Sequence, residues 1–204
     1  MSETFEIARK NMVINQLRPN KINEEKILKI FENIPKENFL DMSLGKNCYL
    51  DKNLDITEKR GYLKNLHLAQ IIKYSEISPN DKVLHLGGLT GYFSTIISSL
   101  SKELLVVEEN KELFKLLEQN VKKNNTVNIN LFNKNLLEGL SEKSPFDLII
   151  IDGPIYEIND NFRLKFEITN IEDRPEYYYW GYNDRLSQYD EYGTSYAIGF
   201  TYNN

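Results

Sequence analysis

The sequence predicts an α/β fold, in which a mostly parallel sheet with flanking helices follows a helical N-terminal part and precedes a β-rich tail. Two observations lead to this expectation. Short apolar strands alternate with helical segments from residue 82 onward, and a glycine turn follows the first strand. Strands joined by helical crossovers run parallel, with helices packed on the sheet faces. We expect strands at residues 82–86, 103–107, 127–132 and 147–151, and helices at residues 91–100 and 110–123.

Apolar residues at helical spacing predict three helices before this alternation begins. The first spans residues 3–17 and closes at Pro19, since proline cannot continue a helix. The second begins at Asn23, a plausible N-cap, and ends at Pro35. The third covers residues 66–74 and leads into a polar turn.

Length, charge and hydropathy narrow the classes of function. The 204 residues are enough for one domain with an appendage. A net charge of −5 disfavours nonspecific binding to nucleic acid or to an anionic membrane, and no apolar run approaches a membrane span. The first residues carry charges where a signal peptide needs an apolar stretch. We therefore expect a cytoplasmic protein without a nucleic-acid partner, and we regard a membrane role as improbable.

The cysteine and histidine content also favours a cytoplasmic protein and gives no indication of a metal site. A single cysteine, Cys48, excludes an intramolecular disulfide and fits a reducing cytoplasm. It also excludes a Cys-based zinc site, and His67 and His85 are too few to suggest another, so we expect no metal. Cys48 is interpreted as a half-buried, apolar-like residue in preference to a nucleophile. His67 is interpreted as a helix residue at the edge of the core in preference to a catalytic base.

The segment VLHLGGLTGY at residues 83–92 carries most of the functional information. A strand that passes through Gly87, Gly88 and Gly91 into a helix brings bare backbone N–H groups close to a ligand. The next strand ends in Glu108, 21 positions after Gly87. In nucleotide-binding α/β folds, an acid at about that distance accepts hydrogen bonds from ribose hydroxyls. The pattern suggests a small-molecule cofactor that carries a ribose.

The order of motifs in residues 5–154 resembles the protein-L-isoaspartate O-methyltransferase family. These are Rossmann-like enzymes that use S-adenosylmethionine. The N-terminal segments are the specific part of the resemblance, because generic methyltransferases lack them. The matching segments are ARKNMVINQLRPNKI (8–22), IPKENF (34–39), CYLDKNLDI (48–56), HLAQII (67–72), NDKVLHLGGLTGY (80–92), VVEEN (106–110), NINLF (128–132) and SPFDLIIIDGP (144–154).

The resemblance implies a role for each candidate cofactor-binding residue. The three turn glycines would lie under the methionine part of the cofactor. Glu108 would hold the ribose hydroxyls, with Glu109 as the neighbouring candidate. Asn135 stands where the family often has an acid near the adenine, and its side-chain oxygen accepts hydrogen bonds as well. Asp152, after the fourth strand, would face the transferred methyl group.

Each of these residues also has a purely structural interpretation. The glycines are compatible with a tight turn alone, and Glu108 with a solvated acid at the end of a strand. Asp152 and Gly153 form a good turn pair on their own. For Asp152, the structural and functional interpretations carry about equal weight.

The sequence departs from the family pattern at three places. Leu89 replaces the middle glycine of the turn, so its side chain either blocks the cofactor or turns away from it. His85 stands where an acid normally orients the amino-acid end of the cofactor. Leu63 occupies the position of the family's active-loop Ser or Thr, and the stretch KRGYLKNLHLA (59–69) has no hydroxyl except that of Tyr62. The catalytic residue is therefore unknown.

The tail departs from the family altogether. Nine of the chain's 13 tyrosines follow residue 155, and residues 162–168 and 195–202 alternate as strands do. These segments are similar to the closing strands of a TonB-dependent outer-membrane receptor. We expect a methyltransferase-like domain at 1–160 (a helical part at 1–78 and a cofactor-binding core at 79–160) and a β-hairpin-like tail at 161–204. The tail either completes the edge of the sheet as an antiparallel hairpin or comes from a fused or frameshifted reading frame.

The predicted function is the S-adenosylmethionine-dependent methylation of the isoaspartyl α-carboxylate in damaged proteins, which starts their repair by way of a cyclic imide. A carboxylate is ionised at neutral pH, so catalysis rests mainly on alignment and on exclusion of water. The alternative is a catalytically degenerate protein that keeps the fold and acts as a binding module. A dehydrogenase is disfavoured, because the turn lacks the glycine spacing of the dinucleotide fingerprint.

Overall fold

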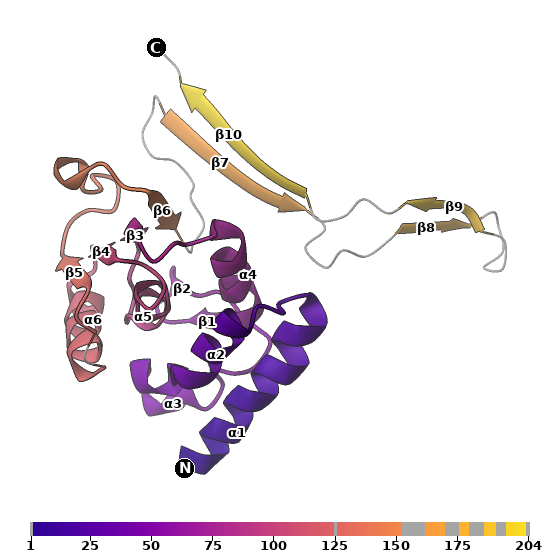
Figure 1. Ribbon diagram of the computed structural model, residues 1–204, viewed down its shortest axis with the longest axis horizontal. Coiled ribbons are helices and arrows are strands. Elements are labelled where there is room, and N and C mark those ends of the chain that lie inside the picture. The colour runs from indigo at the N-terminus through magenta and orange to yellow at the C-terminus, as the bar shows by residue number, and fades with distance from the viewer. Residues whose placement is uncertain are drawn as a thin grey trace. The chain divides into compact units, whose positions relative to one another are not determined.

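The computed structural model describes residues 2–124 and 126–151, together with four strands of the C-terminal part (Figure 1). Backbone contacts divide the chain into two compact units, residues 1–153 and 154–204. Asp152 lies outside the described residues, as does the predicted boundary between residues 160 and 161. The predicted division at residue 160 therefore stays a prediction.

The N-terminal part is helical, as predicted, and holds one hairpin. The first predicted helix is confirmed, although its last five residues form a π-helix. The second begins one residue later than expected: Glu24 is the N-cap, and its carboxylate accepts a hydrogen bond from the Asn23 N–H at 3.0 Å, so the prediction of Asn23 as N-cap is wrong. The elements are α1 (Ser2–Met12), η1 (Val13–Leu17), η2 (Arg18–Asn20), α2 (Glu25–Asn33), η3 (Lys36–Phe39), α3 (Met42–Gly45), β1 (Leu54–Asp55), β2 (Gly61–Tyr62) and α4 (Asn65–Ser75).

A four-stranded parallel sheet follows, and it confirms the α/β prediction. The strand order is β5-β4-β3-β6, and all three neighbouring pairs are parallel. The chain winds from β3 outward to β5 and then returns to the other side of β3, which creates a topological switch point between β3 and β6. The elements are β3 (Lys82–Leu86), α5 (Tyr92–Ser98), β4 (Glu103–Val107), α6 (Lys111–Lys123), β5 (Ile129–Phe132), η4 (Ser141–Lys143) and β6 (Leu148–Ile151).

The two faces of this sheet are covered differently. One face packs against the helices and forms the main hydrophobic core, to which Val83, Leu104 and Val106 contribute. The alternate residues of the same strands, such as Leu84 and Leu105, belong to a smaller cluster. Because successive side chains of a strand point to opposite faces, the near-continuous apolar strands of the sequence supply both clusters.

The C-terminal unit contains four strands in two antiparallel pairs. β7 (Phe162–Thr169) pairs with β10 (Ser195–Tyr202), and β8 (Glu176–Tyr179) pairs with β9 (Leu186–Asp190). The prediction of strands at 162–168 and 195–202 is confirmed, and so is their antiparallel pairing. Within this unit β7 and β10 pair with each other, and completion of the α/β sheet edge by the tail stays a prediction. Within the described part of the chain, no helix is long and apolar enough to cross a bilayer.

Candidate cofactor site at the carboxyl ends of β3 and β4

The glycine turn leaves β3 and packs tightly against its neighbours. Gly87 and Gly91 have φ angles of 93° and 97°, which L-residues rarely adopt. A Cβ on Gly88 would lie 2.6 Å from Val106 Cγ1 and 2.9 Å from Leu117 Cδ2. The glycines therefore have a structural role, because the turn must approach β4 and α6 closely. A cofactor role for them stays a prediction.

Leu89, which replaces the middle glycine, turns its side chain into the protein. Its φ is 48°, its side chain is 2% exposed, and it belongs to the main core. A left-handed conformation costs a leucine roughly 1–2 kcal/mol, which this burial offsets. Of the two outcomes considered for this residue, the structure supports the one in which the side chain turns away.

His85, at the place of the family's acid, is fully buried on β3. Its Nδ1 lies 2.9 Å from Ser94 Oγ, and its ring meets Phe93 edge to face with 5.7 Å between ring centroids. The imidazole therefore links β3 to α5. This packing does not place it as an orienting group for a cofactor.

Glu108 is the most highly coordinated side chain of the site. It is fully buried, so its interpretation as a solvated acid at the end of a strand is wrong. Its Oε1 accepts hydrogen bonds from Arg60 Nη1 at 2.6 Å and from the Asn110 N–H at 2.9 Å. Its Oε2 accepts from Arg60 Nη2 at 2.9 Å and from the Leu89 N–H at 2.8 Å. A bidentate ion pair and two backbone amides thus compensate the burial of the charge.

The predicted adenine residue lies in the exposed turn after β5. The side-chain oxygen of Asn135 accepts a hydrogen bond from the Leu137 N–H at 2.9 Å. Asn133, which sequence reasoning missed, donates its Nδ2–H to the backbone oxygen of Glu108 at 2.7 Å. Asn133 therefore ties this turn to the end of β4. A role for Asn135 near adenine stays a prediction.

The loop that lacks the expected hydroxyl is fastened to the glycine turn by Tyr62. This side chain is buried, and its hydroxyl accepts hydrogen bonds from the N–H groups of Thr90 at 3.2 Å and Tyr92 at 3.1 Å. It also lies 2.9 Å from Thr90 Oγ1. Leu63 is half-buried and packs against the core. The one hydroxyl of the KRGYLKNLHLA stretch is thus committed to a structural contact.

Below this loop lies a buried lysine that sequence reasoning missed. The side chain of Lys36 is 1% exposed, and its Nζ donates to Asn65 Oδ1 at 2.9 Å. The ammonium lies 5.3 Å from the ring centre of Tyr62 and 5.2 Å from that of Tyr92. Two cation–π contacts and an amide oxygen therefore hold this charge under the start of α4. No pattern in the sequence distinguishes it from the many surface lysines.

Two further residues follow their structural interpretations. Cys48 is buried, and burial raises the pKa of its thiol to about 12, which makes it a poor nucleophile. His67 lies half-buried on α4, where burial and then the charge of Lys64 lower its pKa.

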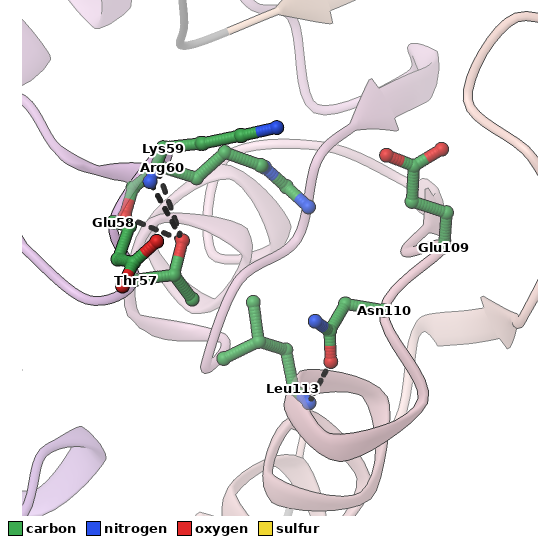
Figure 2. A pocket seen from close by; sticks show the side chains of 7 residues that line it. All are labelled: Thr57, Glu58, Lys59, Arg60, Glu109, Asn110 and Leu113. Carbon is green, nitrogen blue, oxygen red and sulfur yellow. Dashed lines mark hydrogen bonds between the residues drawn. The ribbon is translucent and has the colours of Figure 1, made fainter.

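A cavity of about 330 Å³ opens beside Glu108. Residues 57–60 of the loop form one wall, and Glu109, Asn110 and Leu113 form the other (Figure 2). Glu108 itself does not line this cavity, but its ion-pair partner Arg60 does. The volume is at the lower end of the range found for small-molecule sites.

Comparisons with known proteins agree with this geometry. The family profile described as Protein-L-isoaspartate(D-aspartate) O-methyltransferase (PCMT) matches residues 8–162. The protein-L-isoaspartate O-methyltransferase of Koribacter versatilis is 29% identical over 151 residues, which cover 74% of this chain and 68% of that protein. The protein of the same name from Geobacter metallireducens is 26% identical over 156 residues, covering 76% of this chain and 72% of that protein.

Solved structures confirm the fold. A protein-L-isoaspartate O-methyltransferase aligns with a TM-score of 0.58 at 23% identity, over 78% of this chain and 50% of that one, so this chain spans half of its length. A Plasmodium falciparum structure named as a beta-aspartate methyltransferase (PCMT), in complex with S-adenosyl-L-homocysteine, aligns with a TM-score of 0.59 at 17% identity, over 70% of this chain and 72% of that one. The predictions of a Rossmann-like fold, of the family and of S-adenosylmethionine as its cofactor are confirmed. Because the family profile spans well over half of the chain, this protein belongs to the protein-L-isoaspartate(D-aspartate) O-methyltransferase family of S-adenosylmethionine-dependent methyltransferases.

Proposed function

We propose that this chain transfers a methyl group from S-adenosylmethionine to the α-carboxylate of isoaspartyl residues in damaged proteins. One observation carries the proposal. The glycine turn after β3 and the buried acid after β4 lie side by side at the carboxyl ends of adjacent parallel strands, next to the switch point. Ligands of open α/β sheets bind at this place.

The residues at this edge fit the cofactor in type and position. The turn at Gly87, Gly88 and Gly91 would lie under its methionine part. Glu108 is the acceptor for the ribose hydroxyls, with Glu109 as its exposed neighbour. The adenine then lies toward the turn that contains Asn135, and the cavity beside Glu108 provides room at this side.

Methyl transfer to a carboxylate does not require a strong general base from the protein. S-adenosylmethionine supplies an electrophilic methyl group on its sulfonium sulfur. The acceptor carboxylate is ionised at neutral pH, so the protein needs to align the reacting atoms and exclude water. Leu63 stands where the family pattern has a hydroxyl, and Asp152, which follows β6 in the sequence, is the residue proposed to face the transferred methyl group.

The proposed partner is a protein or peptide that contains isoaspartate, and the proposed location is the cytoplasm. Isoaspartate forms by ageing of protein chains, so a flexible substrate segment must reach the carboxyl edge of the sheet. The buried thiol of Cys48 and the lack of any second cysteine fit a reducing compartment.

Calorimetry on the full chain tests the cofactor role of the site. We expect S-adenosylhomocysteine to bind and NAD to give no heat, and Glu108→Gln to weaken the binding of S-adenosylhomocysteine at least tenfold. Glu25→Gln, which removes one partner of the exposed ion pair with Arg18, is the matched control and should bind as the unmodified chain does. Equal affinities of Glu108→Gln and the control would remove Glu108 from the ribose role.

A labelled-methyl assay then tests the reaction. We expect label on an isoaspartyl peptide and none on the same peptide with ordinary aspartate. The absence of the loop hydroxyl specifically favours the second candidate, a binding module that keeps the cofactor site. Tight binding of S-adenosylhomocysteine without transfer of label would support that candidate and refute the enzyme.

A further inference from the structure

The carboxylate proposed to bind ribose is already saturated by the protein. A carboxylate offers about four acceptor positions on its two oxygens. On Glu108, two backbone amides take one position on each oxygen, and the Arg60 guanidinium takes the other two. The amides of Leu89 and Asn110 belong to the turn and to the start of α6, whereas Arg60 comes from a loop 48 residues away in sequence.

The position of the guanidinium matches the place that a ribose diol would need. Both ligands present two adjacent donors to the two oxygens of one carboxylate, so they compete for the same acceptor positions. Glu108 is fully buried, while the Arg60 side chain is 26% exposed and lines the cavity. A ligand that enters the cavity therefore meets the Arg60 side chain, which lines it (Figure 2), whereas Glu108 is not among the lining residues.

The backbone around Arg60 explains why it points to this place. Gly61, the next residue, packs so closely on β1 that a Cβ would lie 2.3 Å from the Leu54 oxygen. The backbone oxygen of Arg60 accepts hydrogen bonds from the N–H groups of Ile56 at 3.0 Å and Thr57 at 2.8 Å. This tight hairpin end fixes the origin of the side chain, so the arginine needs only rotations about its own bonds to leave the carboxylate.

We propose that Arg60 is an internal competitor for the ribose position. Its guanidinium occupies acceptor positions of the Glu108 carboxylate, and the cofactor binds only to molecules in which the Arg60 side chain has moved away from this carboxylate. The proposal rests on the function proposed above. It means that the chain's affinity for the cofactor is set by the fraction of molecules in the open form, since the apparent dissociation constant is the intrinsic one divided by that fraction. It also means that Arg60 regulates the site without touching the reacting atoms.

The test is calorimetry with S-adenosylhomocysteine on the full chain and on Arg60→Gln. Removal of an ordinary cofactor contact weakens binding, whereas removal of a competitor strengthens it. If the closed form holds roughly nine-tenths of the molecules, Arg60→Gln binds about tenfold more tightly. Arg18→Gln is the matched control, because it removes an arginine from an exposed ion pair elsewhere and should leave the affinity unchanged.

A second variant covers the case in which the buried carboxylate without its partner unfolds the protein. Arg60→Lys keeps the charge but makes at most one of the two contacts, so it should also bind more tightly than the unmodified chain. Unchanged or weaker binding by the folded Arg60 variants, while the unmodified chain binds, would overturn the proposal and leave the proposed function standing. If neither the unmodified chain nor any variant binds, the proposed function fails as well. Unchanged affinity in Arg60→Gln together with a loss in Glu109→Gln would move the ribose to Glu109.

Discussion

Tyr62→Phe should destabilise the α/β unit far more than the loss of one hydroxyl suggests. The Tyr62 hydroxyl is the acceptor for two buried backbone N–H groups, those of Thr90 and Tyr92, and it contacts Thr90 Oγ1 as well. Phenylalanine keeps the ring and its packing but removes the acceptor. Both amides then stay buried without their partner.

The magnitude follows from the number of amides left unpaired. An unsatisfied buried donor costs about 1–3 kcal/mol, so two of them should lower the free energy of unfolding by about 2–6 kcal/mol. For a domain of this size, such a loss corresponds to a fall in melting temperature of roughly 4–24 °C.

Tyr92→Phe is the matched control. Tyr92 is buried and meets the Tyr62 ring edge to face at 5.9 Å, but within the described residues its own hydroxyl has no hydrogen-bond partner. Loss of that hydroxyl should be neutral or slightly stabilising.

Urea unfolding measured by circular dichroism at the helical band compares the two variants, because the helices of the described residues all lie in the first unit. Equal losses of stability in Tyr62→Phe and Tyr92→Phe would refute the reasoning. Such a result would mean that the ring positions, and not the hydroxyl, fasten the loop.

Three other expectations follow from burial and packing. Gly88→Ala should cost about 1–3 kcal/mol, because its Cβ would lie 2.6 Å from a β4 side chain, whereas Gly45→Ala, with its nearest neighbour at 3.7 Å, should change little in the same urea titration. The Cys48 thiol, with its pKa raised to about 12 by burial, should react with a disulfide reagent at pH 8 only as fast as the protein unfolds, and reaction within seconds would contradict this. Burial and the charge of Lys64 lower the pKa of folded His67, so below its ordinary value of 6.5 the unfolded chain binds more protons and stability falls as the pH drops. His67→Gln should flatten this fall between pH 7 and pH 5, and an unchanged slope would assign it to other groups.

The strands of the parallel sheet were predictable because each is an apolar run within a short stretch of sequence. β3 and β4 have the predicted bounds, since runs such as Val83–Leu86 can satisfy burial on both faces only as central parallel strands. The start of α2 was missed by one residue because Asn23 and Glu24 are adjacent polar residues, and the sequence does not place a helix end to the exact residue. The pairing partner of the tail strands depends on contacts outside those strands, and their alternating pattern predicts only that they are strands.

The positions of the candidate site residues along the strands and turns were predictable from the sequence, but the contacts of their side chains were not. The spacing from Gly87 placed Glu108 at the end of a strand, but nothing nearby in sequence indicates that Arg60 forms an ion pair with it. The same holds for Lys36, whose amide partner Asn65 lies 29 residues away. The left-handed Leu89 contradicts its own backbone preference, and only the completed core makes that conformation favourable.

Leu89 and the loop residues Arg60 and Tyr62 act together, because their contacts meet at Glu108 and the glycine turn. The Leu89 amide and the Arg60 guanidinium bind the same carboxylate oxygen, Oε2 of Glu108, while Tyr62 binds the other side of the same turn. Gly61 lies between the two loop side chains and is pinned against β1, so Arg60 and Tyr62 share one anchor. A change that loosens Tyr62 must therefore alter the geometry at Glu108, even though no atom of Tyr62 touches it. The loop is for this reason better understood as a part of the proposed cofactor site than as a lid that covers it.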